Sequence, residues 1–381
     1  MPGATDQRGT ILLLLAGFLS LGLVAALAAG LSGNAARMAR DRLSDRSLAI
    51  AQEALLAHAS GRPIDAIVGP GYLPCPDLDD DGWAEPTCGS QSGHLGQGQR
   101  LGRLPWKTLG IPDVRDGHGE RLWYAVSSKH KGLLNCGPNA ACVAMDPATA
   151  LGTITVRDPG GTIVHDGRIE DPRRAGAGGA AAVVIAPGPP LERREDLAGT
   201  TLRAQRRDTR EAQLDPQNYL DKAPGAAFGS EDNAAFIDRN DAGQRAGNGD
   251  GFIRGPVRLA DGALAVNDRV AAIGYDDLMP RIMRRIAHEL ARCVRLSAVP
   301  GTPACLRNAR GAWSPLPDEA LQACGLAAAE EPNWWRAWRP HAFRAYDAAP
   351  GAVLVTRLPE ACEGGPPRLH EAPDDVIVAV P

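Results

Sequence analysis

The sequence has 381 residues and a mass of 40.0 kDa, enough to bury a sizeable core and to hold two soluble modules. Its net charge of −4 and pI of 6.1 argue against a nucleic-acid-binding protein, because such proteins carry a strongly basic face. Charged residues at 23% argue against wholesale disorder, whereas 44 Gly, 31 Pro and only 4% aromatic residues predict many loops.

The chain begins with an uncharged stretch from Thr10 to Ala36. Its length of roughly 27 residues is enough to span about 30 Å of hydrocarbon as a helix, whereas the apolar core of a cleavable signal has about 7–15 residues. The Ala26-Leu27-Ala28 triplet nevertheless keeps signal cleavage near Ala28 open as an alternative.

The next stretch, residues 34–60, contains no Gly or Pro and is rich in strong helix formers. Its apolar residues, Leu48 and Leu55 among them, recur at helical spacing. We therefore expect one continuous helix of about 50 residues, near 75 Å long, with its first half in lipid and its second half on a soluble domain.

The N-terminus resembles that of the type IV pilins and the type II secretion pseudopilins. The resemblance is carried by Arg8-Gly9 standing directly before the apolar run Thr10-Ile11-Leu12-Leu13-Leu14. It implies cleavage between Gly9 and Thr10 by a prepilin peptidase, and a helix whose second half packs on a periplasmic β-sheet. Assembly with other pilin-like subunits would then use the apolar helix residues Ile11, Leu12, Leu13, Leu14, Leu15, Phe18, Leu19, Leu21, Leu23 and Val24.

Leu14 stands where major subunits of this family have Glu. A carboxylate within hydrocarbon is costly unless it is paired, so Leu14 implies a subunit that has no neighbouring amine to neutralise. The resemblance therefore implies a minor or tip subunit.

Charge and cysteine content disagree about topology. Arg37, Arg40 and Arg42 follow the apolar stretch and only Arg8 precedes it, which by the positive-inside rule favours a soluble part inside the cell. The cysteines and the leader-like Gly9 favour the opposite, and we follow them. The expected location is the bacterial inner membrane, as a single-pass protein in contact with membrane lipid and with its soluble part in the periplasm.

The eight cysteines form no close CxxC pairs of the kind that bind zinc, so disulfides in an oxidising compartment are the better interpretation. Cys75–Cys88 and Cys136–Cys142 are the natural local bridges. The pairing of the remaining four stays open: Cys293, Cys305, Cys324 and Cys362.

The soluble part contains several expected elements. A short strand is expected at Leu122–Val126, a hairpin at Ile154–Val156 and Thr162–Val164, and an apolar central strand at Ala180–Gly188. Met279, Ile282, Met283, Ile286, Leu290 and Cys293 form one stripe of an amphipathic helix, and a further helix is expected at Pro317–Ala329.

These elements predict an α+β fold: a long N-terminal transmembrane and amphipathic helix packed on a small antiparallel sheet, followed by a loop-rich, disulfide-bonded, α-rich C-terminal module. The expected division is a leader-like segment (1–9), a transmembrane helix (10–36), its amphipathic continuation (37–60), a pilin-like β domain (61–190), a polar insertion or linker (191–256) and a C-terminal helical module (257–381).

An acidic loop is the best candidate for a metal site. Asp77, Asp79 and Asp81 alternate before Gly82, which matches the opening of an EF-hand calcium loop. Position 12 of such a loop needs Glu and is Cys88 here, although Glu85 at position 9 is available. Ca²⁺ is thus a candidate cofactor, and an acidic surface turn is the favoured interpretation.

Other candidate sites are weaker. His288-Glu289-Leu290 matches the start of the zincin motif, but Arg292 replaces its second His. Asp113, Asp116 and Glu120 could form an acid–base pair and are better explained as a charged loop. Trp334, Trp335 and Trp338 could bind a ligand and are better explained as core, and a second acidic stretch, residues 240–250, has irregular spacing.

The sequence therefore predicts a non-enzymatic pseudopilin-like subunit that assembles through its N-terminal helix into a periplasmic filament and does not bind nucleic acid. The alternative is a signal-anchored or secreted periplasmic protein with a ligand-binding or enzymatic role.

Overall fold

The structure is a computed structural model and describes residues 7–62, 70–88, 100–131, 145–148, 150–196, 198–228, 232–236, 251–296, 304–322, 324, 333–346, 352–357, 368–370 and 376–378. Its helices are α1 (Gln7–Gly61), α2 (Arg210–Leu214), α3 (Tyr275–Leu296), α4 (Asp318–Gln322) and α5 (Asn333–Trp338). Short 3-10 turns are η2 (Pro172–Ala177), η3 (Pro216–Asn218), η4 (Ala226–Phe228) and η5 (Arg339–His341).

The strands form five sheets. They are β1 (Leu101–Arg103), β2 (Trp123–Val126), β3 (Thr155–Arg157), β4 (Ile163–His165), β5 (Ala182–Ala186), β6 (Glu192–Arg194), β7 (Leu202–Ala204), β8 (Gly251–Ile253), β9 (Val257–Arg258), β10 (Leu264–Val266), β11 (Arg269–Ile273), β12 (Leu306–Asn308), β13 (Gly311–Pro315), β14 (Ala342–Ala345), β15 (Val353–Val355), β16 (Arg368–Leu369) and β17 (Val376–Val378).

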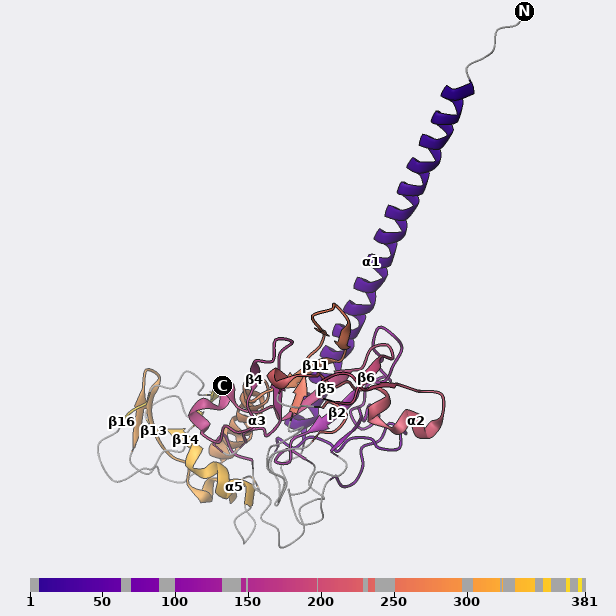
Figure 1. Cartoon of the computed structure of the whole chain (residues 1–381). Coiled ribbons are helices and arrows are strands. Elements are labelled where there is room, and N and C mark those ends of the chain that lie inside the picture. The colour runs from indigo at the N-terminus through magenta and orange to yellow at the C-terminus, as the bar shows by residue number, and fades with distance from the viewer. Residues whose placement is uncertain are drawn as a thin grey trace, which may run out of the picture.

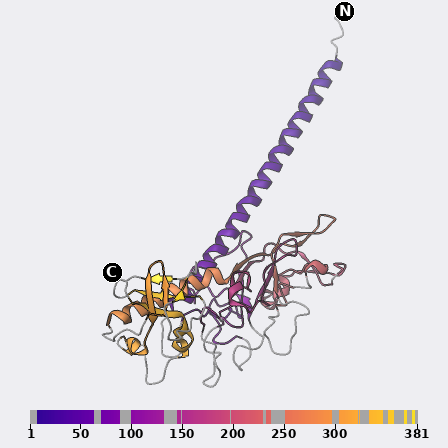
Figure 2. The same cartoon turned by 90° about the vertical axis from the view of Figure 1, so that its left-hand side faces the viewer.

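Helix α1 is a long rod of which only the C-terminal part lies on the body. Figures 1 and 2 show the N-terminal part projecting away from the other elements in two perpendicular views. From Ser44 onwards one face of the helix is buried, at positions that include Ser47, Leu48, Leu55 and Ala59. This face packs against β5, β11 and α3, which agrees with its helical spacing in the sequence.

The sheet beneath α1 is antiparallel, with strand order β1-β2-β5-β11. Alternating side chains of its strands enter two separate cores: Tyr124 and Val184 face the core shared with α1, whereas Trp123 and Ile185 face the opposite side. Burial on both faces explains why β5 is apolar throughout, and the expected central strand at Ala180–Gly188 is confirmed.

Helix α3 lies between two sheets. It contacts α1 on one side and strands β14, β15 and β17 on the other, and its stripe from Met279 to Cys293 is buried in the main core. The second sheet has six strands in the order β16-β12-β13-β14-β15-β17. Its far face carries a small core of its own, formed by Leu306, Trp313, Phe343, Ala352 and Leu354.

Smaller sheets complete the body. Strand β3 pairs with β4 in the expected hairpin and with β8 on its other side, while β6–β7 and β9–β10 are two-stranded. Part of the stretch that reads as a polar insertion is folded, since it contains β6, β7, α2 and η3.

A stack of cations and rings joins this stretch to the first sheet. The guanidinium carbon of Arg103 in β1 lies 4.1 Å from the ring centroid of Trp123 in β2 and 4.1 Å from that of Tyr219. Arg207 covers Tyr219 at 4.2 Å. Because such contacts are strongest when desolvated, the stack helps to hold residues 191–228 on the sheet.

The fold class expected from the sequence is wrong. The structure is rich in sheet, and α1 does not rest on one small sheet, because its packed part is also covered by α3. The C-terminal region is not an α-rich module, since a six-stranded sheet forms its centre and the helix expected at Pro317–Ala329 is limited to α4 in the described residues. Apolar alternation in strands as short as three residues carries little signal, which is why the sequence did not reveal this sheet.

The expectation of a membrane span is contradicted as well. Among the residues that the structure describes, no helix reaches the length and apolar character that crossing a bilayer requires. The predicted transmembrane helix over residues 10–36 and the predicted single-pass location in the inner membrane are therefore not supported.

Candidate functional site

The projecting part of α1, residues 7–39, exposes large apolar side chains among those that the structure describes. Leu15, Phe18, Leu19 and Leu21 are 56–73% exposed. Leu15, Phe18 and Leu19 have the spacing that places side chains on one helical face. Such large apolar side chains rarely remain in water unless a partner covers them.

Several of the predicted assembly residues cannot be placed. The helical backbone of α1 includes Gly9, but the surroundings of this residue lie outside what the structure describes. The same holds for the side chains of Thr10, Ile11, Leu12, Leu13, Leu14, Leu23 and Val24. The structure therefore brings only Leu15, Phe18, Leu19 and Leu21 of the predicted set into view, all on the projecting part of α1.

The projecting part of α1 ends where the loop that contains Arg115 and Gly117 contacts the helix, close to ion pairs with Arg269 and Arg281. Ser47 donates through Oγ to the carbonyl oxygen of Arg115 at 2.6 Å, and the amide of Gly117 donates to Oγ of Ser44 at 2.9 Å. Gly117 is required here, because a Cβ atom would lie 2.1 Å from the carbonyl oxygen of Arg40. These contacts fix the point at which the helix leaves the body.

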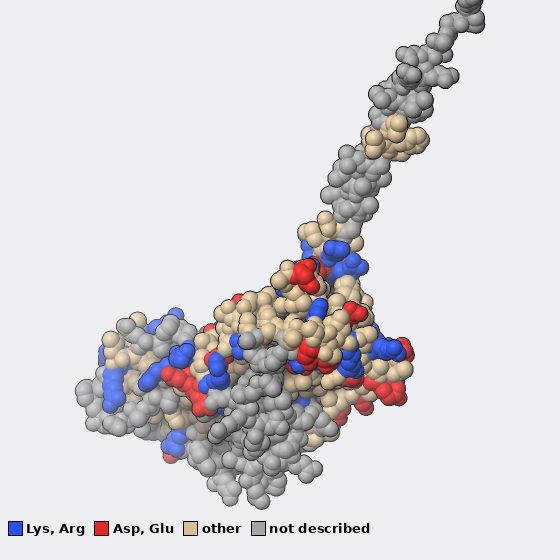
Figure 3. Space-filling model, in the orientation of Figure 1, with Lys and Arg blue, Asp and Glu red and all other residues tan. Residues whose placement is uncertain are grey.

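Ion pairs add further contacts between α1 and the body. Arg269 contacts Asp41 at 3.1 Å and Asp45 at 2.5 Å, and Arg281 forms a bidentate pair with Glu53 at 2.6 and 2.8 Å. Figure 3 shows Lys and Arg side chains gathered where the rod meets the body. The pairs are solvent-exposed, so each contributes little to stability but helps to orient the rod.

A groove runs beside the packed part of α1, between Arg46 and His58. It is lined by Arg46, Ala49, Ile50, Glu53, Ala54, Ala57, His58, Leu109 and Ile111. The small alanine side chains on the helix leave room for another element to approach closely. The pKa of His58 is lowered, chiefly by burial and also by Arg62, so its imidazole is neutral at pH 7. The groove thus continues the exposed surface of α1 onto the body.

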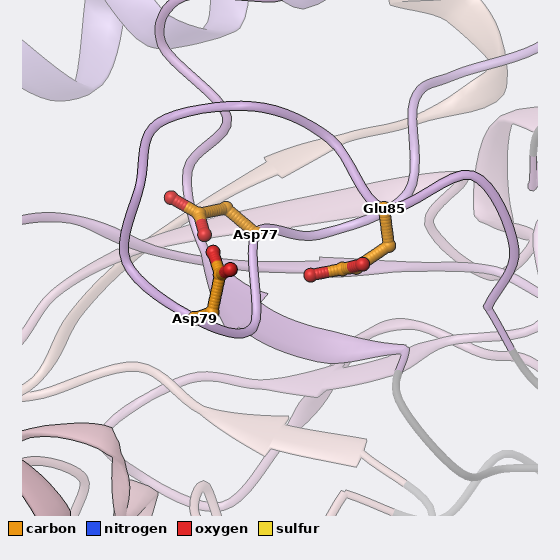
Figure 4. A group of neighbouring side chains, drawn as sticks. All are labelled: Asp77, Asp79 and Glu85. Carbon is orange, nitrogen blue, oxygen red and sulfur yellow. The ribbon is translucent and has the colours of Figure 1, made fainter.

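The acidic loop is a tight turn organised by Asp77 (Figure 4). Its Oδ1 accepts from the amides of Asp80 and Asp81 at 2.8 and 3.2 Å, and its Oδ2 accepts from the amide of Gly82 at 2.7 Å. Gly82 has a φ of +90°, which only glycine adopts without strain. Asp77 therefore organises the turn, but it is a buried residue and not the surface acid of the favoured interpretation.

Three carboxylates of the loop nevertheless converge. One oxygen from each of Asp77, Asp79 and Glu85 lies within 4.8 Å of the others, whereas Asp81 is not part of this group and accepts instead from the amide of Trp83 at 2.7 Å. Oxygen ligands at such spacing suit a hard cation such as Ca²⁺. Of the predicted metal set, the structure thus brings Asp77 and Asp79 together and adds Glu85.

Two basic side chains contact other residues of the acidic loop. Arg121 pairs with Asp80 at 2.7 Å, and the ammonium of Lys107 donates to the carbonyl oxygen of Asp81. The pKa of Asp77 is raised to about 6, mainly by burial, against the three amide hydrogen bonds that lower it. A bound cation would oppose this shift by favouring the ionised form.

The disulfides support an oxidised chain. Cys75–Cys88 closes the acidic loop as predicted, and Cys293–Cys324 joins α3 to the segment after α4. Cys305 is also disulfide-bonded. Cys136, Cys142 and Cys362 lie outside the described residues, so the predicted Cys136–Cys142 bridge stays a prediction.

The weaker candidates have structural roles. His288 is exposed, and Glu289 pairs with Arg285 at 2.8 Å and with Arg292 at 3.5 Å along α3. The three tryptophans are at most 1% exposed and belong to the main core.

The proposed acid–base group is divided among separate partners. Asp116 accepts from the amides of His118 and Gly188, both at 2.8 Å, while Asp113 pairs with Arg115 and Glu120 pairs with Arg207. The second acidic stretch, residues 240–250, lies outside the described residues.

Comparison with protein-family models, with curated proteins and with solved structures finds no match to this chain.

Proposed function

We propose that this protein is a non-enzymatic structural subunit that assembles with pilin-like subunits, including copies of itself, through the projecting part of α1. The observation that carries the proposal is a helix that is held firmly at one end and exposes large apolar side chains at the other. Burying such surface contributes about 25 cal/mol per Å² of apolar area against the cost of association, which favours side-by-side packing with another helix.

The contacts of α1 with the body support this role. Glu53, Ser47 and Ser44 tie the packed part to loops and to α3, so the rod is presented in one direction. The groove lined by Ala49, Ala54 and Ala57 lies on the same helix and offers a second surface at which a neighbouring rod could pack.

Site-specific photo-crosslinking tests the proposal. A photoreactive amino acid at Phe18 should form covalent dimers through α1, either between copies of the chain or with a pilin-like partner. The same group at Tyr346, which is 58% exposed at the end of β14, serves as the matched control and should not do so. Equal yields from both positions, or none from Phe18, would refute assembly through α1.

Charge substitution gives an independent test. Phe18→Asp combined with Leu19→Asp should shift the sedimentation coefficient from an assembled species to the monomer. Leu369→Asp, at a residue that is 74% exposed on the C-terminal sheet, should leave the assembly unchanged. A wild-type chain that stays monomeric with every pilin-like partner would contradict the proposal.

We also propose that the mature chain begins at Thr10. The sequence Arg8-Gly9-Thr10 before the apolar run supports this cleavage. Intact-mass measurement of protein from its native host should show loss of residues 1–9. A chain beginning at Met1 or at Ala29 would contradict it.

A further inference from the structure

Two buried carboxyl groups meet where residues 191–228 contact the turn before β11. Asp221, which follows η3, and Asp268, which precedes β11, are both 0% exposed. The amide of Asp221 donates to Oδ2 of Asp268 at 2.7 Å, so the two residues are in direct contact although they are separated by 47 positions.

Three of the four carboxyl oxygens in this pair have hydrogen-bond donors. Oδ1 of Asp221 accepts from Nε2 of Gln205 at 2.9 Å, and its Oδ2 accepts from the amide of Asn267 at 2.8 Å. Oδ2 of Asp268 also accepts from Nδ2 of Asn233 at 2.8 Å. Oδ1 of Asp268 is buried without a hydrogen-bond partner among the described residues. An ionised carboxylate is poorly stabilised in such a position, so the pair is expected to retain a proton.

The arginines that face the pair are engaged with other acids. Arg193 donates to Asp232 at 2.6 Å and to Glu195 at 2.7 Å, and Arg207 pairs with Glu120 at 2.8 Å. Arg193 and Arg207 still lower the pKa of Asp221, and Arg207 lowers that of Asp268, but burial outweighs them at both groups.

The neighbouring cations are also directed elsewhere. Lys222, next to Asp221, donates to the carbonyl oxygen of Glu195 at 3.0 Å. Arg269, next to Asp268, pairs with Asp41 and Asp45 of α1. None of these groups supplies a close positive partner to the buried pair.

The pKa values of both carboxyl groups are raised, mainly because the groups are buried. Burial raises the pKa of Asp221 to about 7. Burial, together with the charge of Asp221, raises the pKa of Asp268 well above its usual value. Interacting carboxyls of this kind release their protons as a coupled pair.

The pair adds a polar contact between two segments that the ring stack and an apolar core already join. Residues 191–196, 198–228 and 232–236, called the lobe here, supply Gln205, Asp221 and Asn233. Asn233 also exchanges hydrogen bonds with the backbone of Ile253 in β8, at 2.7 and 3.0 Å. Asp268 belongs to the turn that leads into β11 of the first sheet. The carboxyl pair therefore fastens the lobe to the body.

We propose that Asp221 and Asp268 form a proton-dependent clasp that holds the lobe closed in acid and loosens as the pH rises towards neutrality. Both groups ionise readily once the lobe opens, because water then reaches them, whereas both resist ionisation in the closed state. The stabilisation is complete below the pKa of the open state, near 3.8 for a free Asp, and is lost as the pH rises to the raised pKa of the closed state.

Amide hydrogen exchange measures this opening. Opening releases at least one proton between pH 5 and 7, and each proton released makes the opening constant rise about tenfold per pH unit. Protection of the amides of Asp221, Ile253 and Gly255 should therefore fall at least about 100-fold between pH 5 and 7. The values are corrected for intrinsic exchange. The amides of Ala345 and Thr356, bonded within the six-stranded sheet region, serve as an internal reference and should stay constant relative to one another.

Variants separate the clasp from general pH effects. Asp221→Asn combined with Asp268→Asn should remove the pH dependence of lobe protection. Asp196→Asn, at a partly exposed carboxylate in the same lobe, should retain the wild-type slope. Equal slopes in the double variant and the wild type would overturn the proposal.

A measurement on the wild-type chain covers the case in which the double variant does not fold. Carboxyl ¹³C resonances of Asp221 and Asp268 should titrate above pH 6 and shift together. Titration of both below pH 5 would show that the closed state holds no proton and would overturn the clasp.

Discussion

The close contact between Gly117 and α1 predicts that adding a single methyl group at this position strongly lowers the stability of the protein. In Gly117→Ala the new Cβ atom would lie 2.1 Å from the carbonyl oxygen and 2.6 Å from the carbonyl carbon of Arg40. Ordinary contacts of this kind are about 3.4 Å or longer, so the loop must move by more than 1 Å. Both partners are backbone atoms, and no flexible side chain can absorb the shift.

The magnitude follows from two losses. Overpacking of a close contact costs about 1–3 kcal/mol, and separation of the Gly117 amide from Oγ of Ser44 removes a hydrogen bond with a net contribution of about 1 kcal/mol. We expect Gly117→Ala to lower the free energy of unfolding by about 2–4 kcal/mol.

Urea denaturation of the full chain measures this loss, and amide exchange locates it. Exchange should increase in residues 115–119 and on α1 from Asp41 to Leu48, while the β13–β14 pair stays protected. Gly61→Ala is the matched control, because nothing lies within 4 Å of its added Cβ atom. Stability and exchange at the wild-type level in Gly117→Ala would show that the loop does not rest on α1.

Two further substitutions test the packing of α1 and the acidic loop. Leu55→Ala, at a fully buried residue of the α1 core, should cost about 3–4 kcal/mol in urea denaturation, whereas Leu43→Ala, at a residue that is 49% exposed, should cost less than about 1 kcal/mol. A small loss in Leu55→Ala would mean that α1 is not seated in the core. Asp77→Ala should cost about 2 kcal/mol, because three amides lose their acceptor, and should exceed Asp79→Ala, which affects one amide. Equal costs for these two substitutions would contradict the role of Asp77 as the turn former.

Local elements were predicted where the sequence pattern is strong. The β3–β4 hairpin surrounds Pro159-Gly160-Gly161, and the turn residues restrict the chain before any tertiary contact forms. The stripe from Met279 to Cys293 predicted α3, because a 22-residue helix shows its period clearly. The C-terminal sheet was missed, since strands such as Leu306–Asn308 and Val353–Val355 are too short to display alternation.

The candidate sites also differ in whether the sequence could predict them. Asp77 and the Cys75–Cys88 bridge could be predicted because the residues are neighbours in the chain. Asp221 and Asp268 could not, because neither residue lies in a motif and they meet only where the segment after η3 contacts the turn before β11. No signal in a single sequence distinguishes these two aspartates from surface acids.

The sequence by itself determined the continuity of α1, the turn at the acidic loop and the amphipathic character of α3, because each depends on interactions between residues a few positions apart. Only the tertiary structure decided which part of α1 projects, since that depends on Gly117, Arg269 and Arg281 arriving from distant segments. It also decided which carboxyl groups lose contact with water. Burial is a property of the whole packed chain, and the ionisation of Asp221 and Asp268 follows from it.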